Sequence, residues 1–315
     1  MITDTHSATG GPGTLANSVK HVTVCICTYK RPELLQKLLH ELELQETDNL
    51  FTFSIVIVDN DRLRSANSTV DSFAAGSKVS LKYLVEPQNN IALARNRTIA
   101  NSTGDFIAFI DDDEFPTKRW LVSLFNLCES GAADGVLGPV LPYFDQPVPE
   151  WLLNGKFFDR PRHPTGFVLG WSLTRTGNVL LRRSLFENVP EPFHPQCIEG
   201  SDQEYFKRMI QAGYTFVWCD EAVVYEVVPP ARWRRSFLIR RAFYRGVFSI
   251  RNHGLPLKLV ATSMVAAPVF ALVSAVAVLF GQAAFMKYFF KLSYHAGRLL
   301  AAFGFNPIDR PYVSQ

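Results

Sequence analysis

The sequence contains few cysteines and no pattern of side chains typical of a zinc site. Five cysteines, an odd number, are scattered over 315 residues, and the seven histidines show no ligand spacing. This distribution argues against a disulfide framework and favours small buried cysteines in a reducing compartment. We therefore interpret the cysteines as core residues and the histidines as structural or surface residues.

Motifs of several common enzyme classes are also missing. The sequence has no Gly-Lys-Ser/Thr phosphate loop, no Gly-x-Gly-x-x-Gly turn and no arrangement typical of a Ser-His-Asp triad. No apolar leader opens the chain, because residues 1–20 are rich in Thr, Ser and Gly. We expect these residues to form a flexible tail.

The small net charge of +3 hides an uneven distribution of charged residues. Residues 221–315 carry 12 Lys or Arg against 3 acids, whereas residues 1–220 carry 20 against 26. A basic C-terminal part on an acidic body indicates an anionic partner, and charge alone allows a membrane surface as well as nucleic acid. The length and the apolar fraction of 47% suffice for one large α/β domain and an appendage.

Strand-like and helix-like segments alternate from residue 22 onwards, which predicts a mainly parallel α/β sheet. The expected strands are 22–27, 53–58, 79–85, 106–110, 135–140 and 178–181, and the expected helices are 32–42, 65–75, 91–100, 118–128 and 202–211. The stretch 141–166, rich in proline and aromatic residues, is expected to form a long loop over the site.

An acidic cluster, Asp111-Asp112-Asp113, comes directly after the apolar run 106–110. Ligands of such sheets bind beyond the carboxyl ends of the strands. Asp111 and Asp113 could together hold a hard cation such as Mg²⁺ or Mn²⁺. The alternative is a solvated acidic loop in which Asp113 or Thr117 caps the next helix.

A second polar cluster is the turn Asn89-Asn90, which leads into a helix that carries Arg95. Helix N-termini and arginines both suit a diphosphate group. The alternative is that Arg95 is an ordinary surface charge.

Taken in order and at their separations, four segments resemble the family 2 glycosyltransferases with the GT-A fold. They are Cys27-Thr-Tyr-Lys-Arg-Pro32, Ile57-Val-Asp-Asn60, Ala94-Arg-Asn96 and Phe109-Ile-Asp-Asp-Asp-Glu114, within a match of about residues 21–245. Segments 136–140, 180–183 and 226–229 are similar to bacterial succinoglycan-type exopolysaccharide enzymes, which add glucose to a polyprenyl-diphosphate-linked oligosaccharide. The resemblance implies a GT-A domain over 21–228 and a membrane-associated helical region over 229–315.

The resemblance also implies a role for individual residues. The uridine nucleotide would be held by Thr28, Tyr29, Arg31, Asp59, Asp61 and Asp112, and Arg95 would face the nucleotide or its diphosphate. Asp111 and Asp113 match the metal-binding acids, with Mg²⁺ or Mn²⁺ as cofactor. Asn178, Trp171 and Arg241 are expected on the acceptor or donor-sugar side. The implied substrates are a UDP-sugar, with UDP-glucose favoured, and a lipid-linked acceptor.

Inversion in one step requires a carboxylate that takes the proton of the acceptor hydroxyl. In similar enzymes an acidic pair stands where this chain has Ser201-Asp202, and the second acid is the base. We therefore expect Asp202 to be the base, with Glu204 and Glu199 as alternates because Ser201 departs from the pattern. Asp202 can also serve as a helix cap.

Two C-terminal segments indicate membrane association. Arginines alternate with aromatic residues over 232–245, which predicts a basic amphipathic helix, and 259–281 runs 23 residues without a charge. A second apolar stretch, 283–303, leaves a hairpin or monotopic insertion open beside a single span. The alternative is a buried core helix of a soluble protein. We expect binding to lipid at the cytoplasmic face of the inner membrane and no nucleic-acid partner.

The residues alone leave two other functional classes open. A nucleotidyltransferase acting on a sugar phosphate also uses acids on an α/β sheet, but residues 28–31 do not form the Gly-rich basic loop that it typically needs. A non-catalytic membrane adaptor with a decayed GT-A domain is the other class. The acidic residues after successive strands argue against it.

Overall fold

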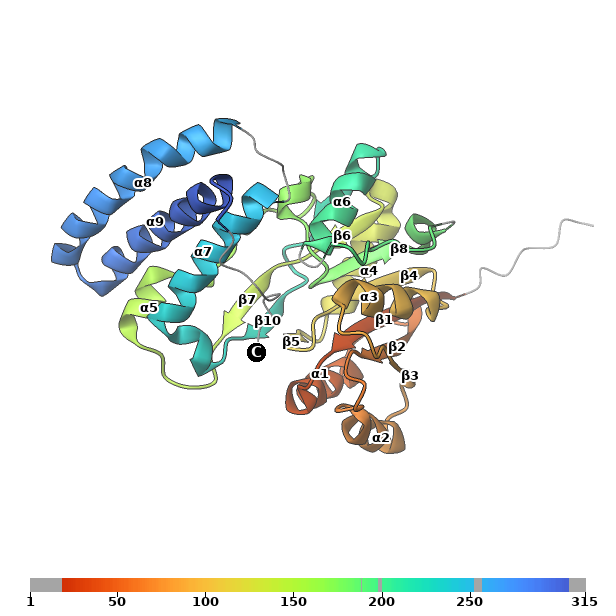
Figure 1. The fold of residues 1–315 in the computed structure, drawn as a ribbon. Coiled ribbons are helices and arrows are strands. Elements are labelled where there is room, and N and C mark those ends of the chain that lie inside the picture. The colour runs from red at the N-terminus through yellow and green to blue at the C-terminus, as the bar shows by residue number, and fades with distance from the viewer. Residues whose placement is uncertain (1–18, 188, 198–199, 252–256, 306–315) are drawn as a thin grey trace, which may run out of the picture.

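A seven-stranded sheet forms the centre of the computed structural model, which describes residues 19–187, 189–197, 200–251 and 257–305. Its strand order is β3-β2-β1-β4-β8-β6-β9 (Figure 1). The strands are β1 Lys20–Thr28, β2 Phe51–Asp59, β3 Ser80–Val85, β4 Phe106–Phe109, β6 Gly135–Leu137, β8 Val179–Arg182 and β9 Phe216–Trp218. Neighbouring strands are parallel except at β8, which runs antiparallel to β4 and β6. The predicted mainly parallel sheet is confirmed.

Helices cover both faces of this sheet. Successive residues of a strand point to opposite sides, so both faces present side chains for helices to cover. The helices are α1 Pro32–Glu43, α2 Asn67–Gly76, α3 Ile91–Ala100, α4 Trp120–Leu127 and α6 Ser201–Gln211. Val24 and Ile26 of β1 pack in one core cluster with the leucines of α1. Cys25, between them, lies in the cluster that includes Phe206 of α6. Pro32 begins α1, where its missing N–H costs no hydrogen bond.

A second, three-stranded sheet was not predicted from the sequence. It consists of β5 Glu114–Pro116, β10 Val224–Val227 and β7 Val140–Tyr143, in the order β5-β10-β7. Glu226 pairs in register with Glu114 on one side and Pro142 on the other. This small sheet therefore begins directly after the acidic cluster that follows β4.

The expected long loop over 141–166 is wrong in part. Its first residues belong to β7, and it also contains helix α5 Glu150–Gly155, whose Leu152 packs with Leu238 and Met286. The aromatic residues that, with the prolines, suggested a loop are what packs this segment against the C-terminal helices. Lys20, expected in the flexible tail, lies in β1, and residues 1–18 lie outside the described residues.

Short helical turns connect several of these elements. They are η1 Cys128–Ala132, η2 Trp171–Leu173, η3 Arg183–Phe186, η4 Pro230–Trp233 and η5 Val278–Phe280.

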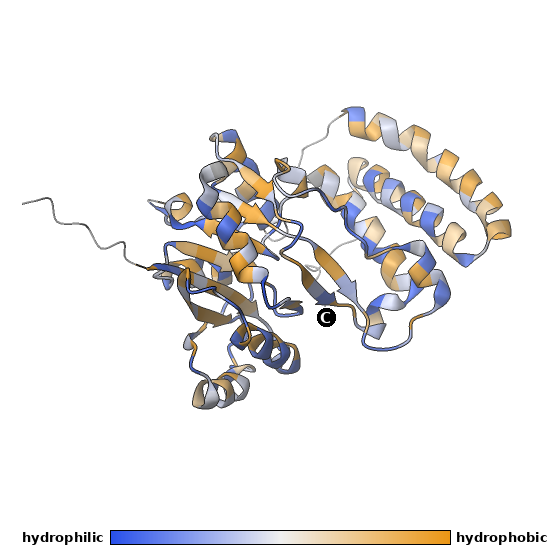
Figure 2. Cartoon of the chain, turned by 180° about the vertical axis from the view of Figure 1, so that it is seen from behind, coloured by the Kyte–Doolittle hydropathy of each residue, from blue (hydrophilic) through white to orange (hydrophobic). Residues whose placement is uncertain are grey.

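Three long helices, α7 Arg235–Arg251, α8 Leu257–Ala277 and α9 Gln282–Ala302, form the C-terminal part of the described chain. α9 packs against α7 on one side and α8 on the other (Figure 1). α8 is apolar along most of its length, whereas α7 and α9 are mixed (Figure 2). Including η5, residues 257–280 are long and apolar enough to cross a membrane, and only 17% of their most apolar window is buried.

Two glycines bring α7 and α9 into close contact. A Cβ atom on Gly246 would lie 2.0 Å from the carbonyl oxygen of Tyr294, and one on Gly297 would lie 2.1 Å from that of Phe243. Both obstacles are backbone atoms, which cannot rotate away. The crossing of the two helices therefore depends on the missing side chains.

We predict that Gly297→Ala destabilises the protein by about 1–3 kcal/mol, because the added methyl group overpacks the α7/α9 contact. Gly76→Ala is the matched control, since a Cβ atom there meets no atom within 4 Å. Thermal unfolding of the detergent-solubilised protein should show a lower Tm for Gly297→Ala alone. Equal Tm values for the two variants would contradict the close packing.

Candidate functional site

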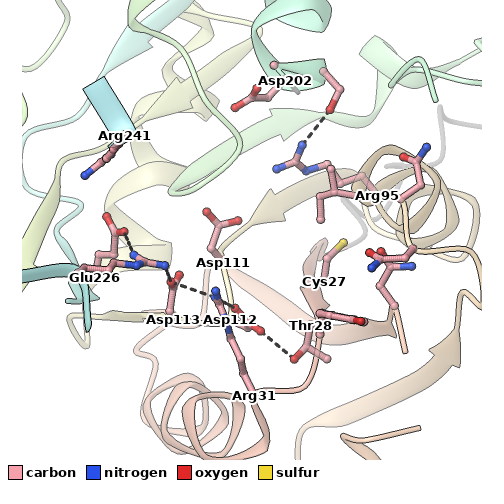
Figure 3. A pocket seen from close by; sticks show the side chains of 18 of the residues that line it. Cys27, Thr28, Arg31, Arg95, Asp111, Asp112, Asp113, Asp202, Glu226 and Arg241 are labelled. Carbon is pink, nitrogen blue, oxygen red and sulfur yellow. Dashed lines mark hydrogen bonds and ion pairs between the residues drawn. The ribbon is translucent and has the colours of Figure 1, made fainter. Parts of the chain in front are cut away.

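A pocket of about 770 Å³ lies at the carboxyl ends of β1 and β4 (Figure 3). Residues from the sheet edge, the start of α6, β10 and α7 line it together. They include Thr28, Tyr29, Arg31, Asn60, Asn89, Asn90, Arg95, Asp111, Asp112, Asp113, Ser201, Asp202, Glu226, Arg232, Phe237 and Arg241. Segments that are far apart in the sequence thus share one cavity.

The loop after β1 fixes the middle acid of the cluster. The Thr28 hydroxyl donates a 2.9 Å hydrogen bond to the Asp112 carboxylate, and Arg31 forms ion pairs of 3.0 Å with Asp112 and 3.1 Å with Asp113. Burial raises the pKa of Asp112 to about 6, and the charge of Arg31 opposes this rise. Asp112 is therefore oriented by residues of the β1 loop.

Asp111 and Asp113 flank this buried acid and are more accessible to the pocket. Loss of hydration within the pocket raises the pKa of Asp111 to about 6, an effect that Arg95 opposes and the neighbouring carboxylates increase. Burial also raises the pKa of Asp113, with a further contribution from the nearby Glu226. Crowded carboxylate oxygens that repel one another are the donor set that a hard divalent cation stabilises. The residues therefore fit a Mg²⁺ or Mn²⁺ site.

A chain of ion pairs connects the acidic cluster to β10. Arg232 lies 3.4 Å from the Asp113 carboxylate and 3.1 Å from that of Glu226, and it is only 8% exposed. Glu226 also forms an ion pair with Arg160. Glu226 and Arg232 were not predicted from the sequence to be site residues. The motif that begins at Glu226 was the available signal, but its partner in the small sheet, Glu114, lies 112 positions earlier in the chain.

Asp202 reaches the pocket from the second residue of α6. Gly200 precedes the helix with a φ of 73°, a left-handed conformation that glycine adopts readily. Ser201 accepts a 3.2 Å hydrogen bond from Arg95, which links α6 to α3 across the pocket (Figure 3).

The alternates to Asp202 are placed differently. Glu204 does not line the pocket; it forms a 3.1 Å ion pair with Arg208 and lies 3.4 Å from His194. Glu199 lies outside the described residues.

Asp59 and Asp61 do not line the pocket, although the family resemblance placed both at the nucleotide. The buried Asp59 carboxylate accepts hydrogen bonds from the backbone of Asp61 and Ala66, at 3.0 and 2.8 Å, and from the Tyr83 hydroxyl at 2.9 Å. Asn60, between the two acids, lines the pocket instead. Asp59 therefore shapes the loop that presents Asn60.

Asn178 and Trp171 are also outside the pocket lining. Asn178 is fully buried, and its amide donates to the carbonyl groups of Pro139 at 2.8 Å and Ala222 at 2.7 Å. Its side-chain oxygen accepts a 2.7 Å hydrogen bond from the Trp120 indole. Asn178 therefore holds three segments of the protein together, and the structure does not bring it to the pocket as expected. Trp171 is the first residue of η2, and the Lys207 Nζ atom lies 5.5 Å from the centre of its ring.

Comparison with known proteins identifies relatives of this chain. The model of the family described as "Glycosyl transferase family 2" matches residues 23–190. The chain is 33% identical over 251 residues to the succinoglycan biosynthesis protein ExoM of Rhizobium meliloti, covering 76% of this chain and 79% of the relative.

Solved structures show the same GT-A fold. The mannosyltransferase PcManGT from Pyrobaculum calidifontis, in complex with GDP-Man and Mn²⁺, is 17% identical with a TM-score of 0.61, over 90% of this chain and 86% of that one. Residues 1–349 of TarS of S. aureus, in complex with UDP-GlcNAc, are 17% identical with a TM-score of 0.52, over 90% of this chain and 92% of that fragment.

Proposed function

The chain belongs to glycosyl transferase family 2 and is a glycosyltransferase, and from this premise we propose that it acts in exopolysaccharide or cell-surface polysaccharide synthesis. In this proposal it moves a sugar, with glucose favoured, from a UDP-sugar to a polyprenyl-diphosphate-linked oligosaccharide. The relative in Rhizobium meliloti is a succinoglycan biosynthesis protein, and TarS was solved with a UDP-sugar. The observation that carries the proposal is that Asp111, Asp113 and Asp202 line one pocket.

The proposed nucleotide site lies along the loops after β1 and β2. Thr28, Tyr29, Arg31 and Asn60 line this side of the pocket. Asp112 takes part by holding Arg31, with which it forms a 3.0 Å ion pair. Arg95 faces the same cavity from α3, where a guanidinium group suits a phosphate oxygen.

Asp111 and Asp113 are the proposed ligands of Mg²⁺ or Mn²⁺. A cation bound there would neutralise charge on the departing diphosphate as the bond to the sugar breaks. Arg31 and Arg232 hold Asp113 in place from two sides.

Asp202 is the proposed general base. It lies across the pocket from the β4 acids, at the end of a separate helix (Figure 3). This arrangement leaves space between base and leaving group for a sugar that is attacked from the opposite face. The acceptor hydroxyl would lose its proton to Asp202 while it attacks the anomeric carbon, which inverts the configuration.

The apolar surface of α8 is the proposed membrane contact. Val265, Val269, Leu272 and Val276 are each at least 50% exposed and recur at helical spacing. Arginines and lysines nearby, including the exposed Arg234, Arg235 and Lys258, suit anionic headgroups. We place the protein at the cytoplasmic face of the inner membrane, where a lipid-linked acceptor presents its sugar.

We predict that Asp113→Asn lowers turnover at least roughly a hundred-fold, because the cation contributes several kcal/mol to the transition state. Titration with Mn²⁺, followed by electron paramagnetic resonance, should show weakened binding in this variant. Asp145→Asn, at an exposed position outside the pocket, is the control. Full activity of Asp113→Asn in the presence of a chelator would rule out the proposed metal site.

We predict that Asp202→Asn lowers kcat by about 10²- to 10⁴-fold and leaves the Kd for UDP nearly unchanged, since a base acts on the acceptor. Glu204→Gln is the control because Glu204 is outside the pocket lining. Loss of turnover in Glu204→Gln but not in Asp202→Asn would show that Asp202 is not the base. A retained anomeric configuration in the NMR spectrum of the product would contradict the one-step mechanism.

We predict that the double variant Val265→Asp/Leu272→Asp shifts the protein from the membrane fraction to the soluble fraction, because charges on this face oppose insertion into lipid. Leu63→Asp is the control, since Leu63 is an apolar side chain that is 74% exposed between β2 and α2, far from α8 in the sequence. The distribution after a salt wash is measured by sedimentation. If the double variant remains in the pellet as the control does, α8 is not the membrane contact.

A further inference from the structure

We propose that Arg241, supported by Arg160 and Arg175, forms a phosphate-binding site on the α7 side of the pocket. The inference rests on the proposed function, because both substrates named there carry a diphosphate: the donor nucleotide and the lipid-linked acceptor. It assigns a ligand to the wall of the pocket that the acidic cluster does not occupy.

Arg241 projects from α7 into the pocket (Figure 3). Its guanidinium lies 5.6 Å from the centre of the Phe158 ring, which supports the side chain from behind. Within the described ranges, no carboxylate lies within ion-pairing distance of Arg241. Its cation thus faces the cavity with no carboxylate partner among these residues.

The surroundings of Arg241 are themselves cationic. Burial lowers its pKa, and the charges of Arg245, Arg160 and Arg232 lower it further. Glu226 is the carboxylate that opposes this effect, but it already forms ion pairs with Arg160 and Arg232. Gathering cations in this way costs free energy that a bound anion offsets.

Arg175 adds a second cation without an ion-pair partner in the described part of the chain. Burial lowers its pKa to about 10, and the charge of Arg160 lowers it further. Its Nε atom is buried and makes no hydrogen bond to the described residues. Arg175 does not itself line the pocket, so it adds positive charge near Arg160 and is not proposed to contact the ligand.

A phosphate is the anion that best fits this site. A guanidinium presents parallel N–H donors that match two phosphate oxygens, and a planar fork of this kind binds phosphate with defined geometry. The ion-pair chain Asp113–Arg232–Glu226 places the arginines beside the proposed metal ligands. Arg241 therefore lines the same pocket as the proposed metal ligands, on its α7 wall.

The test compares Arg241→Ala and Arg241→Lys with Arg240→Ala in the detergent-solubilised full-length protein. Arg240 is the preceding residue of the same helix, is exposed and does not line the pocket. Calorimetry with UDP in the presence of Mn²⁺ measures the donor side. Initial rates against a water-soluble, short-chain diphosphate-linked acceptor measure the acceptor side without a contribution from membrane attachment.

If the phosphate belongs to the donor, Arg241→Ala weakens UDP binding by about 10- to 100-fold, as expected for charged hydrogen bonds. Arg241→Lys should restore part of the affinity, and Arg240→Ala should match the wild type. If the phosphate belongs to the acceptor, UDP affinity is unchanged and the KM for the acceptor rises by a similar factor. Either result supports the site and identifies its source.

Unchanged UDP affinity together with an unchanged acceptor KM in Arg241→Ala would overturn the inference while leaving the proposed function intact. A wild-type protein that neither binds UDP nor transfers a sugar from it would overturn both. Thermal unfolding of each variant tests whether a loss of binding results from a loss of the fold.

Discussion

Mutual repulsion among carboxylates at the end of β4 is the constraint around which the site is built. Asp111, Asp112 and Asp113 are consecutive, and Glu226 lies close enough to raise the pKa of two of them. Arginines from two directions offset this charge: Arg31 from the β1 loop and Arg232 from the turn before α7. The loop after β1 of the large sheet and the turn after β10 of the small sheet are thereby fixed relative to one another by electrostatics as well as by packing.

This charge arrangement also explains why the small sheet matters. β5 begins directly after Asp113, and β10 pairs with it in the register that sets Glu226 opposite Glu114. Glu226 in turn pairs with Arg232 and Arg160. The acids, their arginine partners and the first turn of the C-terminal helices therefore form one connected unit at the edge of the pocket.

Local sequence patterns were sufficient for six strands of the large sheet, but β9 Phe216–Trp218 was not predicted. β-branched runs predicted its strands, leucine spacing predicted α1, and the acids after β4 were placed at the pocket by the rule that ligands bind at carboxyl strand ends. These features depend on residues that are neighbours in the chain. The structure places Asp202 at the same cavity, and its catalytic role is a proposal.

Features that depend on distant partners could not be predicted in this way. β5 spans only three residues, too few for a periodic pattern, and it exists because β10 pairs with it more than 100 positions later. The family resemblance implied that Asn178 lies on the sugar side, but its side-chain amide is hydrogen-bonded to Trp120, Pro139 and Ala222. Nothing next to Asn178 in the sequence reveals these partners.

The close crossing of α7 and α9 connects the proposed membrane contact on α8 with one wall of the pocket. α7 carries Phe237 and Arg241 at the pocket and, a few residues later, Gly246 at its contact with α9. α9 in turn packs along α8, whose apolar face is exposed. Because a glycine contact against backbone leaves little room for sliding, a tilt of the α8–α9 hairpin is transmitted to α7 as a rigid body. The orientation of the hairpin therefore sets the position of one wall of the cavity.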